Sequence, residues 1–518
     1  MDRSALGEMV VGNMLATAAV RFARQEAWHC VPTGRRYSFA QANARCNRLA
    51  NGLLALGLRQ GECVAFLSTN RAEVAEIYFA LAKAGLVGLP LNYRLAPVEM
   101  LALMQEVCAV ALLCERKFAE VAALVHAELP TLRVQVGFGD GATPAGAHDY
   151  EALLASASAS EPAVQVHEHD PYYFNLTSGT TGLPKCYLIS HYNAATFANM
   201  FQALHMARED VVMTVFPMYG RVGFAWVACG VMYGCRNVLT NFDAAQALEL
   251  IGRERVSITN LVPTMGAMLM ARPELDGAQL GSLRALVFAG SLLAAPVRDG
   301  VMARICPRLY EYYGMQETST LVVSTPEDRL RRPDSVGQPI LFAQVRVVDE
   351  AGHDVPAGQT GAVIGRSPGT VTGYYNNPEK TAETFRDGWL HTGDLGRLDD
   401  EGYLFINGRL KDVIVTGGQN VHAGEVEEAI LGFAGVADCA VVGLPDPLWG
   451  ESVSAVVVPV PGYSVDPEAL LAWCRRSLAG FKTPKRVLLQ ADPLPRTATG
   501  KVQKFLLVTR YGTPPAQP

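Results

Sequence analysis

Residues 172–185 read YYFNLTSGTTGLPK, and this stretch is the strongest indication of the fold. Its first five residues predict a short buried strand, and the loop after them consists mostly of Gly, Ser, Thr and Lys. Glycines let backbone N–H groups converge on an anion, hydroxyls add donors, and the lysine adds a positive charge. The pattern predicts a phosphate-binding loop followed by a helix, with these contact residues: Thr177, Ser178, Gly179, Thr180, Thr181, Gly182 and Lys185.

The loop differs from the phosphate loop of the Walker type. Pro184 stands where the second glycine would donate an N–H, and Cys186 stands where Ser or Thr would hold magnesium. The alternative interpretation is a connecting turn of Ser, Thr and Gly. A run of this composition directly after a strand favours the phosphate loop.

Short β-rich runs alternate with helical patterns on both sides of this loop. This alternation predicts an α/β fold with largely parallel strands. The segment from Gly139 to Ser160 is rich in Gly, Ala and Ser and predicts a surface connection, with a helix from Tyr150 to Ser156. The predicted strands lie within residues 62–69, 86–92, 109–114, 172–176, 211–217, 257–263 and 285–290.

The pattern of hydrophobic and turn residues changes after Gln338. Shorter β-rich pieces separated by turn residues predict a small β subdomain. After Arg409, roughly a hundred residues with strand and helix patterns are enough for an independent α+β domain. We therefore predict a large N-terminal domain of several subdomains, residues 1–408, and a small C-terminal domain, residues 409–518.

Composition excludes several classes of protein. The chain has 518 residues, 49% of them hydrophobic, and a net charge of −6, without a block of like charges that would suit nucleic acid or an anionic membrane. Asp2 and Glu8 stand where a secretory signal would be basic, and the uncharged stretch from Val222 to Cys235 is too short to cross a bilayer. The scattered cysteines lack metal spacing. We expect a cytoplasmic protein with no membrane span, no structural zinc and no nucleic-acid partner.

A second cluster, YEYYGMQET at residues 310–318, combines aromatic rings, a glycine and a carboxylate. Such residues suit a nucleotide base, close backbone approach and a magnesium ion. Taken alone, the tyrosines are more often core residues and the glutamate a solvated or capping acid. The candidates are Tyr312, Tyr313, Gly314, Gln316 and Glu317.

A third cluster lies near the predicted domain boundary. Asp394 is set between glycines and suits the two hydroxyls of a ribose, and Arg409 is placed to reinforce the same site. Turn chemistry is the alternative for Asp394. The run TGGQN contributes two further candidates, Gly417 and Gly418. The predicted loop PRTATGK contributes a third, Lys501, near the C-terminus.

These segments, in this order, resemble the adenylate-forming superfamily of acyl-CoA synthetases, peptide-synthetase adenylation domains and firefly luciferases, and most closely the acyl-CoA synthetases. The resemblance runs from residue 37 to Lys501. It implies that the N-terminal domain binds ATP and a carboxylic acid, and that the small C-terminal domain is mobile and turns about a hinge at Lys411. It also implies ATP, Mg²⁺ and coenzyme A as cofactors, with Lys501, Lys185 and Glu317 as catalytic residues.

The resemblance assigns further roles to single residues. Thr177 and Glu317 would hold the metal, Tyr313 would stack near adenine, and Asp394 and Arg409 would bind the ribose. Gly290, Tyr312, Gly314, Gln316, Gly417 and Gly418 complete the expected cofactor site. The acid pocket would be formed by Tyr219, Gly220, Arg221, Phe224 and Ala289.

Some positions depart from the family pattern. Gln316 replaces a threonine, the histidine of an aromatic–His gate is missing around Gly220, and Ala423 replaces a proline. Arg221 either pairs with a second carboxylate of the substrate or braces a helix. Aryl, medium-chain, branched and carnitine-like acids all stay open as substrates.

The expected function is an ATP-dependent acid:CoA ligase that forms an acyl-adenylate and releases AMP and pyrophosphate. One alternative is a stand-alone adenylation enzyme that loads a carrier protein. A second is a catalytically degenerate nucleotide-binding homologue, against which the retained lysines and carboxylates argue. A homodimer is left open.

Overall fold

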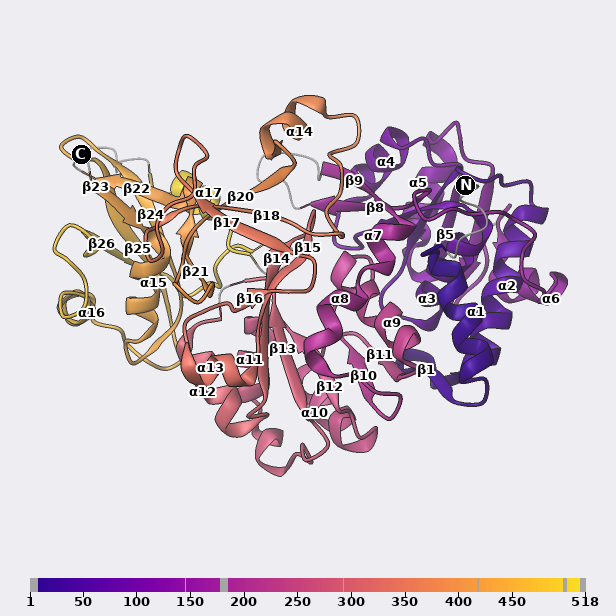
Figure 1. Cartoon of the computed structure of the whole chain (residues 1–518), viewed down its shortest axis with the longest axis horizontal. Helices are drawn as coiled ribbons and strands as arrows, with labels where there is room; N and C mark the ends of the chain where they lie inside the picture. Colours follow the sequence, from indigo (N-terminus) through magenta and orange to yellow (C-terminus); the bar gives the residue numbers. More distant parts are fainter. Residues whose placement is uncertain are drawn as a thin grey trace.

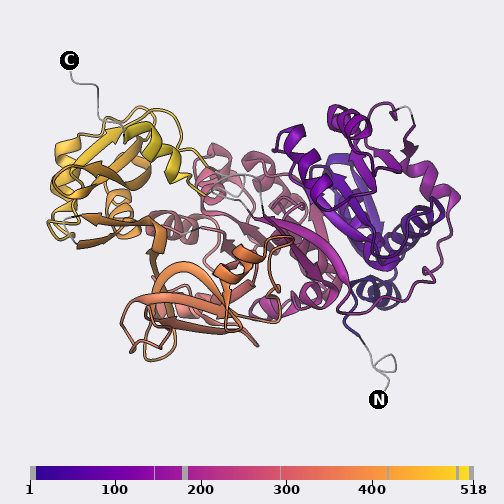
Figure 2. The same ribbon diagram turned by 90° about the horizontal axis from the view of Figure 1, so that it is seen from above.

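The N-terminal part of the chain contains two large β-sheets, and the C-terminal part contains two smaller ones (Figure 1). The computed structural model describes residues 8–144, 146–177, 185–291, 293–416, 419–496 and 501–512. In both views the C-terminal sheet lies at the end of the molecule opposite α2 and α6 (Figures 1 and 2). This arrangement confirms a mixed α/β fold with a large N-terminal and a small C-terminal domain.

The first large sheet has seven strands in the order β7-β6-β5-β3-β4-β8-β9. Its neighbours are parallel except for the antiparallel pair β8–β9. The strands predicted at 62–69, 86–92, 109–114 and 172–176 are confirmed. The bounds are β3 Cys63–Leu67, β4 Val87–Leu91, β5 Ala111–Glu115, β6 Val134–Phe138, β7 His148–Asp149, β8 Pro171–Thr177 and β9 Lys185–Ser190.

The second large sheet has nine strands in the order β16-β15-β14-β13-β12-β10-β11-β1-β2. Its central strands are parallel, and antiparallel partners close both edges. The three remaining strand predictions are confirmed here by β10, β12 and β13. The bounds are β1 Glu26–Cys30, β2 Arg35–Ser38, β10 Val211–Thr214, β11 Arg236–Leu239, β12 Ile258–Leu261, β13 Ala285–Ala289, β14 Leu309–Met315, β15 Ser319–Ser324 and β16 Gln338–Pro339.

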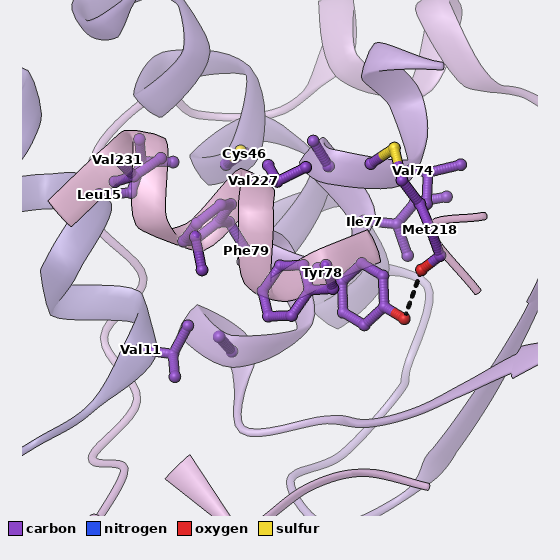
Figure 3. Close-up of a cluster of buried hydrophobic side chains, with 14 of the residues drawn as sticks. Val11, Leu15, Cys46, Val74, Ile77, Tyr78, Phe79, Met218, Val227 and Val231 are labelled. Atoms are coloured by element: carbon purple, nitrogen blue, oxygen red, sulfur yellow. Dashed lines mark hydrogen bonds between the residues drawn. The ribbon is translucent and has the colours of Figure 1, made fainter. Parts of the chain in front are cut away.

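Two buried helices, α3 (Ala72–Ala84) and α9 (Arg221–Tyr233), pack in the core between these sheets. Every residue of α3 is buried, and the helix contacts β4 of one sheet and β1 of the other. The Tyr78 ring stacks on Phe224 with centroids 4.0 Å apart, and its hydroxyl donates to the Met218 carbonyl at 2.9 Å (Figure 3). Burial of two aromatic rings with a satisfied hydroxyl fixes α9 against α3.

The other helices cover the sheets and the C-terminal domain. The helix predicted at residues 150–156 is confirmed as α6. The helix bounds are α1 Val11–Arg21, α2 Phe39–Ala55, α4 Pro97–Glu106, α5 Ala119–Glu128, α6 Tyr150–Ser156, α7 His191–Ala195, α8 Ala198–Phe201, α10 Ala244–Arg253, α11 Pro263–Met270, α12 Ala295–Arg304, α13 Pro326–Arg331, α14 Pro378–Thr384, α15 Ala423–Leu431, α16 Pro467–Cys474 and α17 Lys504–Tyr511. In the part of the chain that the structure describes, no helix combines the length and apolarity that a bilayer span needs.

Two five-stranded sheets follow β16. The first is the predicted β subdomain, and the second is packed with α15 and α17 in the C-terminal domain. The 408/409 boundary stays a prediction; β21 ends at Arg409 and β22 begins at Val413. The bounds are β17 Gln344–Val348, β18 Gly361–Arg366, β19 Phe385–Arg386, β20 Trp389–Leu398 and β21 Leu404–Arg409, then β22 Val413–Thr416, β23 Gln419–His422, β24 Val436–Asp446, β25 Gly450–Pro459 and β26 Arg486–Leu489.

The helix predicted directly after the phosphate loop is wrong, because strand β9 lies there. Residues of β9 alternate between two cores: Tyr187 and Ile189 pack in the core with α3, whereas Cys186 and Leu188 pack in the core with α4. A period of two is the signature of a strand buried on both faces. The chain therefore returns antiparallel to β8, with Lys185 opposite Thr177.

Candidate active site

The phosphate-loop candidates lie where the β8–β9 hairpin closes. Thr177 ends β8 and Lys185 begins β9, and the two residues are paired across the hairpin. The Lys185 ammonium lies 5.2 Å from the centroid of the Tyr374 ring. Five candidates of this loop and two of the TGGQN run lie outside the described residues: Ser178, Gly179, Thr180, Thr181, Gly182, Gly417 and Gly418.

The β14–β15 hairpin presents Glu317. A Cβ on Gly314 would lie 2.0 Å from the Ser319 carbonyl oxygen, so only glycine fits the close approach of these strands. The Thr318 hydroxyl accepts from the Met315 N–H at 3.1 Å and closes the turn between them. The Glu317 side chain is 5% exposed, and the Tyr374 hydroxyl donates to its Oε1 at 2.6 Å. Glu317 is thus a fixed, nearly buried carboxylate.

Asp394 and Arg409 come together as predicted for a common site. They face each other across β20 and β21, and Arg409 Nε lies 2.9 Å from Asp394 Oδ1. The Tyr313 hydroxyl donates to Oδ2 at 2.7 Å. Each carboxylate oxygen carries two lone pairs, so both keep acceptor capacity for a further hydroxyl.

Lys501 from the C-terminal domain lies within the field of these groups. Burial lowers the pKa of Lys501, and the positive charges of Arg409 and Lys411 lower it further. The carboxylates of Asp394 and Glu317 act in the opposite direction. One lysine from the C-terminal domain and two carboxylates from the N-terminal part therefore form one electrostatic cluster.

Lys185 and Lys411 are the other cations of this cluster. Burial lowers the pKa of Lys185, with a further contribution from Lys380, while Glu383 and Glu317 oppose it. Lys411 lies in a short 3₁₀ turn, Leu410–Asp412, between the last strand of the β subdomain and the first strand of the C-terminal sheet. The repulsion among these cations, which contributes to the lowered lysine pKa values, would be relieved by an anionic ligand.

Tyr312 and Gly290 occupy different environments. Tyr312 is 6% exposed within the core around α3 and α9, and among the described residues its hydroxyl has no hydrogen-bond partner. Gly290 follows β13 with φ at +97°, a conformation that favours glycine. Tyr312 therefore fits the alternative interpretation of the aromatic cluster, in which the tyrosines are core residues.

Four of the five acid-pocket candidates lie at the start of α9: Tyr219, Gly220, Arg221 and Phe224. Gly220 is the N-cap of this helix, and Ala289 ends β13. The Tyr219 ring meets Tyr93 edge to face at 5.3 Å, and burial raises its pKa to about 12. Phe224 is fully buried against Tyr78 in the core.

Arg221 braces the backbone around Glu317. Its two terminal nitrogens donate to the carbonyls of Gln316 at 2.6 Å and Gly369 at 2.7 Å. The side chain is 2% exposed and lies over Phe197. These contacts agree with a bracing role rather than with pairing to a substrate carboxylate.

The donor set fits magnesium delivered with a polyphosphate. Among the described residues, no group of three or more His, Cys, Asp or Glu side chains is arranged to enclose a metal. Glu317 offers one oxygen to Tyr374 and leaves the other for a cation. Magnesium is commonly held by one or two carboxylates together with phosphate oxygens, so one fixed carboxylate suffices.

Sequence reasoning missed Tyr374 and Tyr187. The Tyr187 hydroxyl donates to the Gln316 carbonyl at 3.0 Å, beside the Arg221 contact. Tyr374 belongs to the run GYYNN at residues 373–377, which has the composition of a turn. Its two aromatic residues between glycine and asparagines were the available signal.

Comparison with known families matches both parts of the chain. Residues 15–375 match the family described as "AMP-binding enzyme", and residues 425–501 match the "AMP-binding enzyme C-terminal domain". These segments cover the β8–β9 hairpin, Glu317 and the run PRTATGK, which ends at Lys501.

Individual relatives agree with the family matches. A feruloyl-CoA synthase of Amycolatopsis sp. is 36% identical over 92% of this chain and 95% of its own length. An indoleacetate–CoA ligase of Aromatoleum aromaticum is 35% identical over 91% and 92%. The solved structure of ATP-bound MatB from Rhodopseudomonas palustris superposes with a TM-score of 0.89 at 30% identity, covering 98% of this chain and 99% of that one. The chain therefore belongs to the AMP-binding, adenylate-forming enzymes, the family that includes the acyl-CoA synthetases.

Proposed function

We propose that this protein is an ATP-dependent carboxylic acid:CoA ligase that works through an acyl-adenylate and releases AMP and pyrophosphate. The observation that carries the proposal is the cluster of Lys501 with Glu317, Asp394 and Arg409, built from distant parts of the chain. Three lysines and an arginine beside two carboxylates suit a magnesium-bound polyphosphate.

In the first half-reaction, a carboxylate oxygen of the acid attacks the α-phosphorus of ATP. The bond between the α-phosphorus and the bridging oxygen breaks, and pyrophosphate leaves with that electron pair. Two anions must meet, so Lys501 and Lys185 lower the barrier by stabilising charge on the transferring and leaving phosphoryl groups. No side-chain nucleophile is needed, because alignment of the two substrates supplies the remainder.

The candidate ligands for the metal are Glu317 and Thr177. Bound Mg²⁺ would offset negative charge on the phosphates. Asp394 and Arg409 hold the ribose, with the Tyr313 hydroxyl fixing the carboxylate from the opposite side. The protein therefore binds and orients the nucleotide mainly through residues that are already hydrogen-bonded to one another.

In the second half-reaction, the sulfur of CoA attacks the acyl carbon of the adenylate. The carbon–oxygen bond to AMP breaks, a thioester forms, and the thiol proton is released. The linker that contains Lys411 joins the two domains and is the proposed hinge for the reorientation between the half-reactions.

We propose an apolar, aromatic monocarboxylic acid as the substrate class. Both terminal nitrogens of Arg221 donate to backbone carbonyls, so they are not free to form a bidentate pair with a second substrate carboxylate. The names of the two relatives at 35% and 36% identity specify aryl acids, ferulate and indoleacetate. Aromatic acids therefore come first in the test panel, ahead of medium-chain, branched and carnitine-like acids.

The test measures pyrophosphate release with ATP and Mg²⁺ across this acid panel, followed by AMP formation on addition of CoA. Acid-dependent pyrophosphate release and CoA-dependent AMP release together support the ligase. Transfer to a phosphopantetheinylated carrier protein, with no transfer to CoA, would identify the adenylation enzyme instead. The absence of both reactions with every acid, despite ATP binding, would identify a degenerate homologue. The cytoplasmic location belongs to the same proposal, and a homodimer stays open as the assembly.

A further inference from the structure

Tyr374 touches two members of the candidate ATP site that lie far apart in the sequence. Its hydroxyl donates to Glu317 Oε1 at 2.6 Å, and its ring lies 5.2 Å from the Lys185 ammonium. Resting on the proposed function, we infer that Tyr374 is a positioning residue that orients the Glu317 carboxylate for magnesium and holds Lys185 beside it.

The hydrogen bond from the Tyr374 hydroxyl determines which oxygen of Glu317 is left to bind a cation. It uses one of the two carboxylate oxygens, so the other is directed to a fixed place instead of rotating about the terminal torsion, which is otherwise broad. A phenol has an ordinary pKa near 10, so its hydroxyl stays protonated throughout the neutral range and can donate a hydrogen bond. Glu317 is nearly buried, and a charge-assisted bond in such surroundings is stronger than one in water.

The contact with Lys185 depends on the ring and not on the hydroxyl. An ammonium within about 6 Å of a ring centroid is attracted by the negative face of the π-system. Lys185 begins β9 directly after the candidate phosphate loop, so the ring restricts where its charge lies. The two functions of Tyr374 are therefore separable by substitution.

Tyr374 is itself fixed by the backbone. It forms an antiparallel bridge with Tyr187 of β9, and the next N–H, of Tyr375, donates to the Cys186 carbonyl at 2.8 Å. The Thr381 hydroxyl accepts from the Tyr374 N–H at 2.9 Å. The ring thus stands on a braced segment, which is what a positioning role requires.

Three variants of the full-length protein separate these contributions. Tyr374→Phe removes the hydroxyl and keeps the ring, whereas Tyr374→Leu removes both. Tyr375→Phe is the matched control, since it removes a phenol hydroxyl from the next residue. The Tyr375 ring packs on Phe174. Thermal melts establish that each variant is folded.

The main readout is ATP binding without acid or CoA, measured calorimetrically across a magnesium titration and again in EDTA. We expect Tyr374→Phe to raise the magnesium concentration for half-maximal binding about five- to ten-fold, while ATP affinity in EDTA stays within about two-fold of wild type. Tyr374→Leu should show the same magnesium defect and, in addition, bind ATP about three-fold more weakly in EDTA. Tyr375→Phe should match the wild type in both conditions.

A double mutant with Glu317→Gln supplies an independent check. If the hydroxyl acts through the carboxylate, adding Tyr374→Phe to Glu317→Gln should change the magnesium dependence little further. A wild-type magnesium titration for folded Tyr374→Phe, or additive effects in the double mutant, would overturn the inference. Because ATP binding is measured without acid, failure of every acid to release pyrophosphate would reject the ligase and leave this test intact.

Discussion

Replacing Lys501 by alanine removes one cation from the candidate active site. The lysine lies in the field of Glu317 and Asp394 and is followed by the short helix α17. We expect Lys501→Ala to impair formation of the acyl-adenylate strongly. Thioesterification of a preformed adenylate should stay largely intact, because the proposed second step uses a different orientation of the C-terminal domain.

The size of the effect follows from the surroundings of the lysine. Two unit charges 4 Å apart interact by about 4 kcal/mol at an effective dielectric constant near 20. Removal of one preorganised donor to a developing anion costs about 3 kcal/mol in other enzymes. Since each 1.36 kcal/mol is a factor of ten in rate, roughly a hundred-fold loss or more is expected.

Two assays on the same variant test this expectation. Pyrophosphate release reports the first step, and CoA-dependent turnover of a synthetic acyl-adenylate reports the second. Arg510→Ala is the matched control, because it also removes one positive charge, here from α17. The Arg510 guanidinium packs on the Tyr511 ring. Pyrophosphate release from Lys501→Ala at the wild-type rate would refute the assignment.

The same lysine predicts a pH dependence. Burial, and then the charge of Arg409, lower the pKa of Lys501 from its ordinary value of 10.5. The protonated form is the one that stabilises the phosphoryl transfer, so adenylation should fall as pH rises through this lowered pKa. A guanidinium stays protonated, so residual activity of Lys501→Arg should lack this alkaline limb. An unchanged limb in Lys501→Arg, with the fold verified by circular dichroism at each pH, would assign the titration to another group.

Three further substitutions test other parts of the site. Glu317→Ala should raise the magnesium requirement of pyrophosphate release and lower its rate, because a hard cation loses its carboxylate; an unchanged magnesium titration would make Glu317 structural. Gly314→Ala should lower the free energy of unfolding by about 2–3 kcal/mol, because the added Cβ would lie 2.0 Å from the Ser319 carbonyl oxygen. The control Gly277→Ala should leave the stability unchanged, because a Cβ there has no atom within 4 Å. Equal urea midpoints for the two variants would contradict this. Lys411→Pro fixes φ near −65°, so the folded variant should form adenylate but transfer it poorly, as read from the two separate rates; equal loss of both steps, or of neither, would place the hinge elsewhere.

The sequence predicted the fold where local patterns repeat. Alternating helices and buried strands gave both large sheets, because a strand covered on both faces is recognisable as a short apolar run. The error came at Lys185–Ser190, where the expected helix is β9. A phosphate loop is usually followed by a helix, and six residues that pack on two different cores carry too little periodicity to overrule that expectation.

The site was predictable to the extent that its residues lie in motifs. Glu317, Asp394 and Arg409 stand in distinctive runs, and the structure brings the last two into contact. Tyr374, the partner of Glu317, was not predicted, because its bond to Glu317 spans 57 residues and depends on how the segment after β18 crosses β9. A hydrogen bond between distant segments leaves no periodic trace in either of them.

The Gln316–Glu317 segment is held by hydrogen bonds from two sides. Arg221 begins α9, on the side of the expected acid pocket, and holds the Gln316 carbonyl, while Tyr374 holds the Glu317 carboxylate on the ATP side. The described residues offer Arg221 no carboxylate, so its charge is stabilised by backbone carbonyls and the Phe197 ring. Such a buried cation is costly to shift, because each lost hydrogen bond would leave charge unsatisfied in a low dielectric. Arg221 therefore restrains the Gln316 carbonyl, next to the candidate magnesium ligand Glu317.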